Sequence, residues 1–192
     1  QRRRALDGNN SEQAKHARIE LDKAEAMHKQ FHETERDSYD EAATQAIWEP
    51  SDIWTICVDA ATQSNFELPR FKGRKPKGLD AKMPWGSKLF GAYAHGHGLH
   101  VYTVPPYVGH GASRTVTVIQ KTLVEMVASG RPTPRVLHVQ LDNTTGENKN
   151  NLVFTYACWL VQTGFVQKVR IFFLPVGHTH IFIDHVFGAI TK

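Results

Sequence analysis

The spacing of apolar residues changes near residue 50 and separates two kinds of predicted structure. Up to residue 47, apolar side chains are sparse among Ala, Glu, Lys and Gln, and Gly and Pro are almost absent, which is typical of one long solvent-facing helix over residues 11–47. Pro50 ends this pattern because proline cannot continue a helix. We therefore expect residues 1–50 to form a helical extension and residues 51–192 to form the main domain.

Beyond residue 50, short β-branched and aromatic runs alternate with segments of helical spacing. The predicted strands cover residues 53–61, 88–93, 98–104, 135–141 and 167–174. The predicted helices cover residues 113–129, with Ser113 as the expected cap, residues 147–163, and a last stretch from about residue 179. Residues 63–85 contain several Pro and Gly residues and are predicted to be a loop.

The predicted order after the leading helix is three strands followed by alternating helices and strands. This is the order of the RNase H-like fold, an α/β architecture in which helices flank a five-stranded mixed sheet. The last predicted helix has no glycine or proline stop before Lys192, so we expect the domain to continue beyond it.

Composition and charge narrow the function classes. The chain has 192 residues, of which 41% are hydrophobic and 22% charged, and its apolar runs are shorter than the roughly 20 residues of a membrane span. With no signal-peptide pattern and no CxxC pair, an intracellular protein is expected. Residues 1–50 carry a net charge of −3 and residues 51–192 a net charge of +7, so the main domain is expected to favour a polyanionic partner.

Three aspartates stand where this topology would bring carboxylates together. Asp59 lies in the first predicted strand, Asp142 ends the fourth, and Asp184 lies one turn into the last helix. Such a cluster suits two Mg²⁺ or Mn²⁺ ions, which prefer carboxylate oxygens and can activate a water or hydroxyl against a phosphodiester. The spacing alone also fits simpler roles, with Asp59 as a turn residue and Asp142-Asn143 as an Asx turn.

Basic and amide-rich segments accompany these carboxylates. The tract RFKGRKPK follows the first predicted strand and would meet phosphates by releasing counterions, or else be a solvated loop. The segment GENKNN places a glycine, amides and Lys149 at a predicted helix start, which is a ready anion site. The candidate nucleic-acid contacts are Arg70, Lys72, Arg74, Lys75, Lys77 and Lys149.

The GHTH element before the last helix allows two interpretations. His178 and His180 form an HxH pair like that of zinc hydrolases, but Asp184 lies four residues after the second histidine rather than two. On a helix, His180 and Asp184 share a face, so His180 can instead join the carboxylate metal site. Asn143 and His178 are candidate supporting residues.

The segments VDAATQSNFELP, LHVQLDNTTGENKNN and FFLPVGHTHIFIDHVFG together resemble a domain of transposon-derived proteins. It is related to the integrase-like DDE/DDD transposases of the Kyakuja, Dileera and Zisupton group, and the resemblance extends from about Ile53 to the C-terminus. It implies that Asp59, Asp142 and Asp184 are an acidic triad and that the two histidines help to place the third acid. The usual third acid in such enzymes is often glutamate, whereas this chain has an aspartate.

Three functions follow from these residues. The first is metal-dependent cleavage or strand transfer of DNA by a transposase-type core, which would act in the nucleus. The second is an inactive or domesticated DNA-binding or assembly module that forms homo-oligomers through the N-terminal helix. The third is zinc-dependent hydrolysis through the HxH pair.

Overall fold

A computed structural model describes most of the chain. It covers residues 2–61, 67–68, 77–79, 85–86, 88–105, 107–109, 111–174 and 182–190, with the backbone alone described for residues 2–11, 67–68, 79, 85–86, 174, 182, 184 and 190. The described backbone divides into two compact units, residues 1–38 and residues 39–192.

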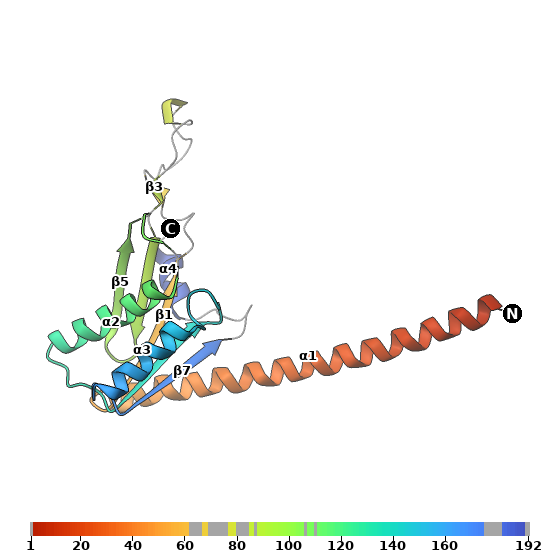
Figure 1. Cartoon of the computed structure of the whole chain (residues 1–192), viewed down its shortest axis with the longest axis horizontal. Coiled ribbons are helices and arrows are strands. Elements are labelled where there is room, and N and C mark those ends of the chain that lie inside the picture. Colours follow the sequence, from red (N-terminus) through yellow and green to blue (C-terminus); the bar gives the residue numbers. More distant parts are fainter. Residues whose placement is uncertain are drawn as a thin grey trace. The chain divides into compact units, whose positions relative to one another are not determined.

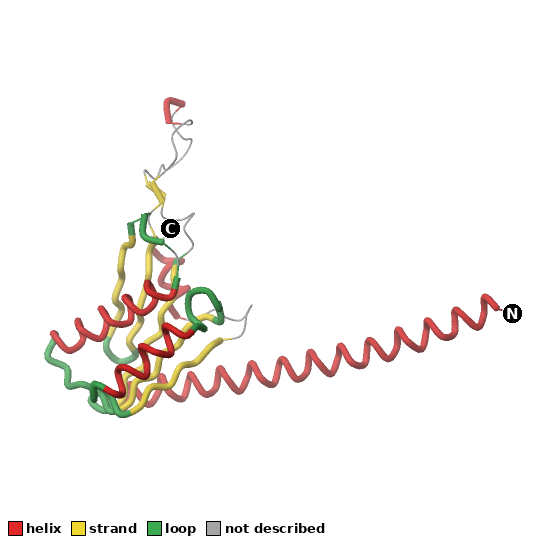
Figure 2. Tube along the Cα trace, in the orientation of Figure 1, coloured by secondary structure: helices red, strands yellow, loops and turns green. Residues whose placement is uncertain are grey.

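Five strands form the mixed sheet that the strand pattern predicts. They are β1 (Ile53–Ala60), β4 (Lys88–Ala94), β5 (Gly98–Val104), β6 (Val136–Asp142) and β7 (Lys168–Leu174). The strand order is β5-β4-β1-β6-β7, with β4 antiparallel to β1 and β5 and with β6 parallel to β1 and β7. This is the strand order of the RNase H-like fold, so the fold prediction is confirmed (Figure 2).

The turn between β4 and β5 depends on glycine. Gly96 and Gly98 have φ angles of 73° and 122°, a region that side chains with a Cβ rarely adopt. The turn is closed by the His97 backbone N–H, which donates to the Ala94 carbonyl at 2.9 Å. The sequence His95-Gly96-His97-Gly98 therefore forms the turn between the two strands.

Helices α2 (Ala112–Ala128) and α3 (Asn151–Gln162) cover one face of the sheet (Figure 1). Their buried stripes meet alternate residues of the central strands, among them Trp54 in β1 and Leu137 in β6, both fully buried. Ser113 is not the cap of α2, contrary to the prediction. The N-cap is Gly111, so Ser113 lies inside the first turn.

Helix α4 (Phe182–Ile190) and the last turns of helix α1 (Arg2–Trp48) cover the other face. Cys57 of β1 packs there with Tyr39 of α1 and with Ile183 and Phe187 of α4. Thr55 of β1 also donates a hydrogen bond to the Ala42 carbonyl at 2.7 Å. The end of α1 is therefore part of the globular unit.

Helix α1 begins nine residues before the predicted start at residue 11 and runs for 47 residues. The predicted long N-terminal helix is confirmed. Within residues 12–38 its large apolar side chains are exposed, including Met27 at 72% and Phe31 at 56%. The proline- and glycine-rich segment predicted to be a loop contains a short antiparallel pair, β2 (Glu67–Leu68) with β3 (Trp85–Gly86), and a 3-10 turn η2 (Lys77–Leu79).

Acid should destabilise the sheet through two buried histidines. Burial lowers the pKa of His95 to about 4, and burial together with Arg170 and Lys168 lowers the pKa of His138 to about 4, from the ordinary 6.5. The unfolded chain therefore binds more protons than the folded chain between these pH values. The free energy of unfolding should fall as the pH drops from 6.5 to about 4, by at most about 1.4 kcal/mol per pH unit for each histidine.

Urea denaturation at a series of pH values measures this dependence. A His138→Gln variant should lose part of the slope, because glutamine does not titrate, whereas a variant of exposed His16 should keep it. Equal slopes for the wild type and His138→Gln would show that His138 does not carry the effect.

Candidate active site

Asp59 and Asp142 stand at the same end of the neighbouring parallel strands β1 and β6. β1 and β6 pair in parallel with a constant register from Ile53 opposite Val136 to Cys57 opposite Gln140. The pairing of β1 with β6 ends there, and Asp59 and Asp142 each lie two residues beyond this last pair. Neighbouring strands are about 4.8 Å apart, and residues opposite each other point to the same face of the sheet.

The face that both aspartates share is the one that α4 covers. Trp54, Ile56 and Val58 alternate with them and pack under α2 and α3, so the odd-numbered residues of β1 point the other way. The same alternation in β6 assigns Leu141 to the α2 and α3 face and Asp142 to the α4 face. Alternation along the two strands thus assigns Asp59 and Asp142 to the same face at the same end of the sheet.

The Asp142 carboxylate is held by the loop that follows it. Its Oδ1 accepts hydrogen bonds from the Thr144 backbone N–H at 3.1 Å, from the Thr144 hydroxyl at 2.7 Å and from the Asn148 side-chain amide. Among the residues that the structure describes, every hydrogen bond to this carboxylate goes to Oδ1. Oδ2 is therefore the oxygen that a ligand would meet.

Asn148 connects this loop to α2. The Thr115 hydroxyl donates to Asn148 Oδ1 at 2.8 Å, and Arg114 Nη2 donates to the neighbouring Glu147 at 2.9 Å. Both Arg114 and Asn148 are buried. Sequence reasoning did not select Thr115, Arg114 or Asn148 as site residues, although the amides of the GENKNN segment were a signal for Asn148.

Because Asn148 turns back towards Asp142, helix α3 starts later than predicted. Residues 145–150 form turns, and the helix begins at Asn151 rather than at about residue 147. Its N-cap is Asn150, whose side chain accepts hydrogen bonds from the backbone N–H groups of Leu152 and Val153. Lys149 lies outside the helix with its Nζ 5.5 Å from the centre of the Phe173 ring.

Asp59 and Gln140 lie on the same face of the sheet as Asp142. Asp59 Oδ1 accepts a hydrogen bond from the Ala60 backbone N–H at 2.7 Å, and Asp59 is half-buried. Gln140 lies two residues before Asp142 on the same face and is fully buried. Its Nε2 donates to the Leu141 carbonyl at 2.9 Å, while its Oε1 has no hydrogen-bond partner among the described residues.

The start of α4 packs against the strand next to Asp59. Gly91 of β4 pairs directly with Asp59. A Cβ at Gly91 would lie 2.7 Å from Ile183 Cδ1 and 3.0 Å from Phe187 Cζ, so both side chains lie on the glycine. Asp184 follows Ile183 in the same helical turn, which sets its backbone on the carboxylate face of the sheet.

The other predicted site residues are placed only in part. Lys77 is exposed in η2, and Asn143 is half-buried directly after Asp142. Outside the described residues lie the remaining basic and histidine candidates, Arg70, Lys72, Arg74, Lys75, His178 and His180. The described side chains include no group of three His, Cys, Asp or Glu residues arranged for a metal ion, and the Asp184 side chain is not among them.

No helix in the described parts of the chain is both long enough and apolar enough to cross a membrane.

Comparison with known proteins gives a family and distant structural likenesses. No curated protein matches the chain. A solved structure described as "Crystal structure of the Mos1 Strand Transfer Complex" is similar with a TM-score of 0.39 and 14% sequence identity, over 83% of this chain and 46% of that chain. This chain therefore spans less than half the length of that protein. A family model matches residues 77–192, more than half of the sequence, and the chain belongs to that family, which is described as "Domain of unknown function (DUF7869)".

Proposed function

We propose that residues 51–192 form a metal-dependent active site that cleaves or transfers strands of DNA, with Asp59, Asp142 and Asp184 as its carboxylates. The observation that carries this proposal is the parallel register of β1 and β6, which, continued by two residues beyond Cys57 and Gln140, would set Asp59 beside Asp142. The packing of Ile183 on Gly91 supports the third position, because it holds the first turn of α4 over the strand next to Asp59.

The donor atoms suit hard divalent cations. Two carboxylates on adjacent strands repel each other, and a cation bound between them would offset that repulsion. Mg²⁺ and Mn²⁺ prefer carboxylate and water oxygens, and the Gln140 Oε1 supplies a buried acceptor for a bound water on the same face. When bound, two such ions would activate the attacking oxygen and neutralise the leaving oxygen of a phosphodiester.

The chain's own residues fix the geometry of this site. The hydrogen bonds from Thr144 and Asn148 to Oδ1 hold the Asp142 carboxylate in one orientation, and Oδ2 would be its oxygen for a cation. Thr115 fixes Asn148 in turn, so helix α2 supports the carboxylate through one intermediate residue. Such support matters because catalytic groups need placement within about 0.5 Å.

The proposed substrate follows from charge. Residues 51–192 carry a net charge of +7, which favours a polyanion. Lys77 and Lys149 are exposed and available to phosphates. The tract with Arg70, Lys72, Arg74 and Lys75 follows β2 in the sequence. A DNA substrate would place this activity in the nucleus.

Incubation of the full chain with end-labelled DNA and Mn²⁺ tests the proposal. We expect cleavage that EDTA abolishes and that an Asp59→Asn variant lacks. The matched control is Asp52→Asn, because Asp52 lies at the opposite end of β1, where it binds Arg135 at 2.9 Å. Equal cleavage by the wild type and Asp59→Asn, or cleavage in EDTA, would overturn the assignment.

A second candidate is a non-catalytic DNA-binding or assembly module. One observation favours it: Asp142 Oδ1 accepts a hydrogen bond from the Thr144 backbone N–H, as it would in a simple Asx turn with no catalytic role. This module would form homo-oligomers through the exposed apolar residues of α1, including Met27 and Phe31. It predicts DNA binding without Mn²⁺-dependent cleavage, and a sedimentation mass above one chain that a Phe31→Glu variant reduces.

A further inference from the structure

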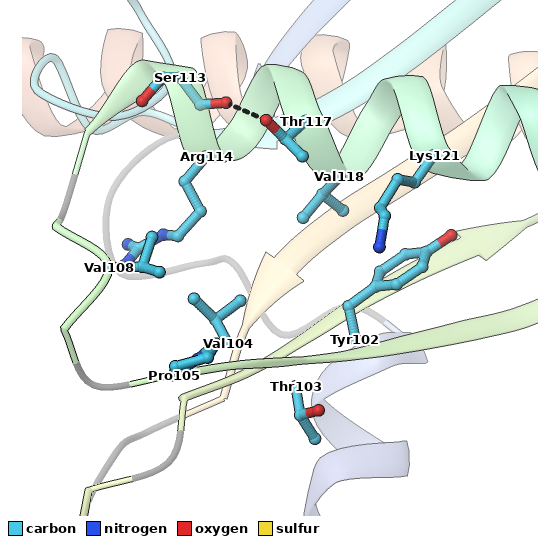
Figure 3. A pocket seen from close by; sticks show the side chains of 10 residues that line it. All are labelled: Tyr102, Thr103, Val104, Pro105, Val108, Ser113, Arg114, Thr117, Val118 and Lys121. Atoms are coloured by element: carbon cyan, nitrogen blue, oxygen red, sulfur yellow. Dashed lines mark hydrogen bonds between the residues drawn. The ribbon is translucent and has the colours of Figure 1, made fainter.

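A pocket of about 240 Å³ lies between the end of β5 and the first turns of α2 (Figure 3). Its floor and walls are mainly apolar and aromatic, and its rim carries hydroxyl and cationic groups. The lining residues are Tyr102, Thr103, Val104, Pro105, Val108, Ser113, Arg114, Thr117, Val118 and Lys121. This volume is below the roughly 300–1,000 Å³ of sites for drug-sized ligands, so it suits a smaller group such as one base with its sugar.

The lining holds two cationic side chains and a rigid aromatic ring. Lys121 is exposed, whereas Arg114 is buried and paired with Glu147 at 2.9 Å. Lys121 Nζ lies 5.7 Å from the centre of the Tyr102 ring, and Figure 3 shows both side chains on the same side of the pocket. The Tyr102 hydroxyl is hydrogen-bonded to Thr122 at 3.0 Å and donates to Glu125 at 2.9 Å, which fixes the ring.

The pocket opens at the same end of the sheet as the candidate active site. Val104 pairs with Lys88, and Phe90, two residues along β4, pairs with Ala60, the residue after Asp59. Arg114 connects the pocket to the loop after Asp142. Its guanidinium lies 4.5 Å from the centre of the Phe90 ring and donates a hydrogen bond to Glu147 in that loop. At this end of the sheet, the pocket lies on the face that α2 covers, and the carboxylates lie on the opposite face, which α4 covers.

We infer that this pocket receives an unpaired nucleotide of the DNA strand that the proposed active site acts on. The base would lie against Tyr102 and the valines, since stacking on an aromatic ring suits any base. The adjoining phosphate would meet Lys121 and the Ser113 hydroxyl at the rim. A base inside a duplex is stacked and paired on both sides, so it has no access to a pocket of this size. The inference rests on the proposed DNA substrate and adds that the substrate has a single-stranded region near the cut.

Binding measured without divalent ions separates this inference from catalysis. The probe is a short fluorescent single-stranded DNA of mixed sequence, titrated with the full chain in EDTA and followed by anisotropy. The pocket-filling variant is Thr117→Trp, because Thr117 is an exposed lining residue of α2. Its matched control is Gln120→Trp, which adds the same side chain at an exposed position of α2 outside the lining.

Thr117→Trp should weaken single-strand binding roughly tenfold, whereas Gln120→Trp should leave it unchanged. Binding to a blunt duplex of the same sequence should be the same for both variants. Lys121→Gln should weaken binding and lower the salt dependence by about one ion, whereas Lys168→Gln, at the far end of β7, should not change single-strand binding. The inference would be overturned if the two tryptophan variants bound the single strand equally well. It would also be overturned if Thr117→Trp lost as much affinity for the duplex as for the single strand, or if the wild type showed no measurable single-strand binding.

The same assay distinguishes failure of the pocket from failure of the active site. Asp52→Asn, at the opposite end of β1 from the candidate active site, should bind the single strand like the wild type in EDTA, because it changes neither the pocket nor the proposed carboxylates. If the wild type does not cleave DNA but Thr117→Trp alone loses single-strand binding, the pocket stands and the nuclease assignment fails. If cleavage depends on the aspartates but Thr117→Trp binds normally, only the pocket fails.

Discussion

Replacing Asp142 by asparagine should reduce Mn²⁺-dependent DNA cleavage by at least roughly a hundredfold and leave the fold nearly unchanged. Asparagine keeps an oxygen that can accept the hydrogen bonds from Thr144 and Asn148, so the loop after β6 should keep its shape. It lacks the negative charge that a divalent cation requires. We expect the free energy of unfolding to change by less than about 1 kcal/mol, measured by urea denaturation.

An Asp142→Ala variant is the informative contrast. Alanine removes the acceptor and leaves the buried Asn148 amide without this partner, which should destabilise the chain by about 1–3 kcal/mol. Both variants should lose cleavage, but only the alanine variant should lose stability. If Asp142→Asn cleaves DNA at the wild-type rate, Asp142 is a turn residue and not a catalytic one.

Replacing Gly91 by alanine should destabilise the chain by about 1–3 kcal/mol and lower cleavage roughly tenfold. The new Cβ would lie 2.7 Å from Ile183 Cδ1, and Ile183 is fully buried, so α4 must shift away from β4. That shift would move the backbone of Asp184 relative to Asp59. Thermal denaturation and single-turnover cleavage measure the two effects.

Two further variants test whether the contact with Ile183 causes these effects. Gly188→Ala adds the same methyl group to α4 at a place where nothing lies within 4 Å, so it should be neutral or stabilising. Ile183→Val removes the Cδ1 atom, so the double variant with Gly91→Ala should recover part of the lost stability and activity. Additive effects of the two substitutions would show that the clash is not the cause.

Much of the architecture was predictable because local patterns determine it. The buried run of β1 and the hairpin of β4 and β5 have strong strand and turn signals, and all three elements lie within one residue of their predicted bounds. The starts of helices were less predictable because tertiary contacts decide them. Asn148 is hydrogen-bonded to Asp142 and Thr115 and lies before the start of α3. The local sequence of the GENKNN segment does not predict this later helix start.

The sequence predicts which residue types the candidate site contains. It does not predict how those residues are arranged in space. Asp59 and Asp142 stand near strand ends in the sequence, but which residues of β1 and β6 face each other depends on the register of the two strands, which no local pattern contains. The pocket beside α2 was not predicted, since its lining comes from β5, the following loop and α2. Its members, such as Tyr102 and Lys121, have no common spacing in the sequence.

The pairing of β1 with β6 also has a consequence for how the chain folds. Thr55 and His138, which meet across these strands, are 83 residues apart in the sequence. Closing so long a loop costs chain entropy before any contact offsets it, so this pairing should form late relative to the local hairpin of β4 and β5. During synthesis, Asp59 leaves the ribosome long before Asp142. The two carboxylates would therefore meet only after most of the domain has been made.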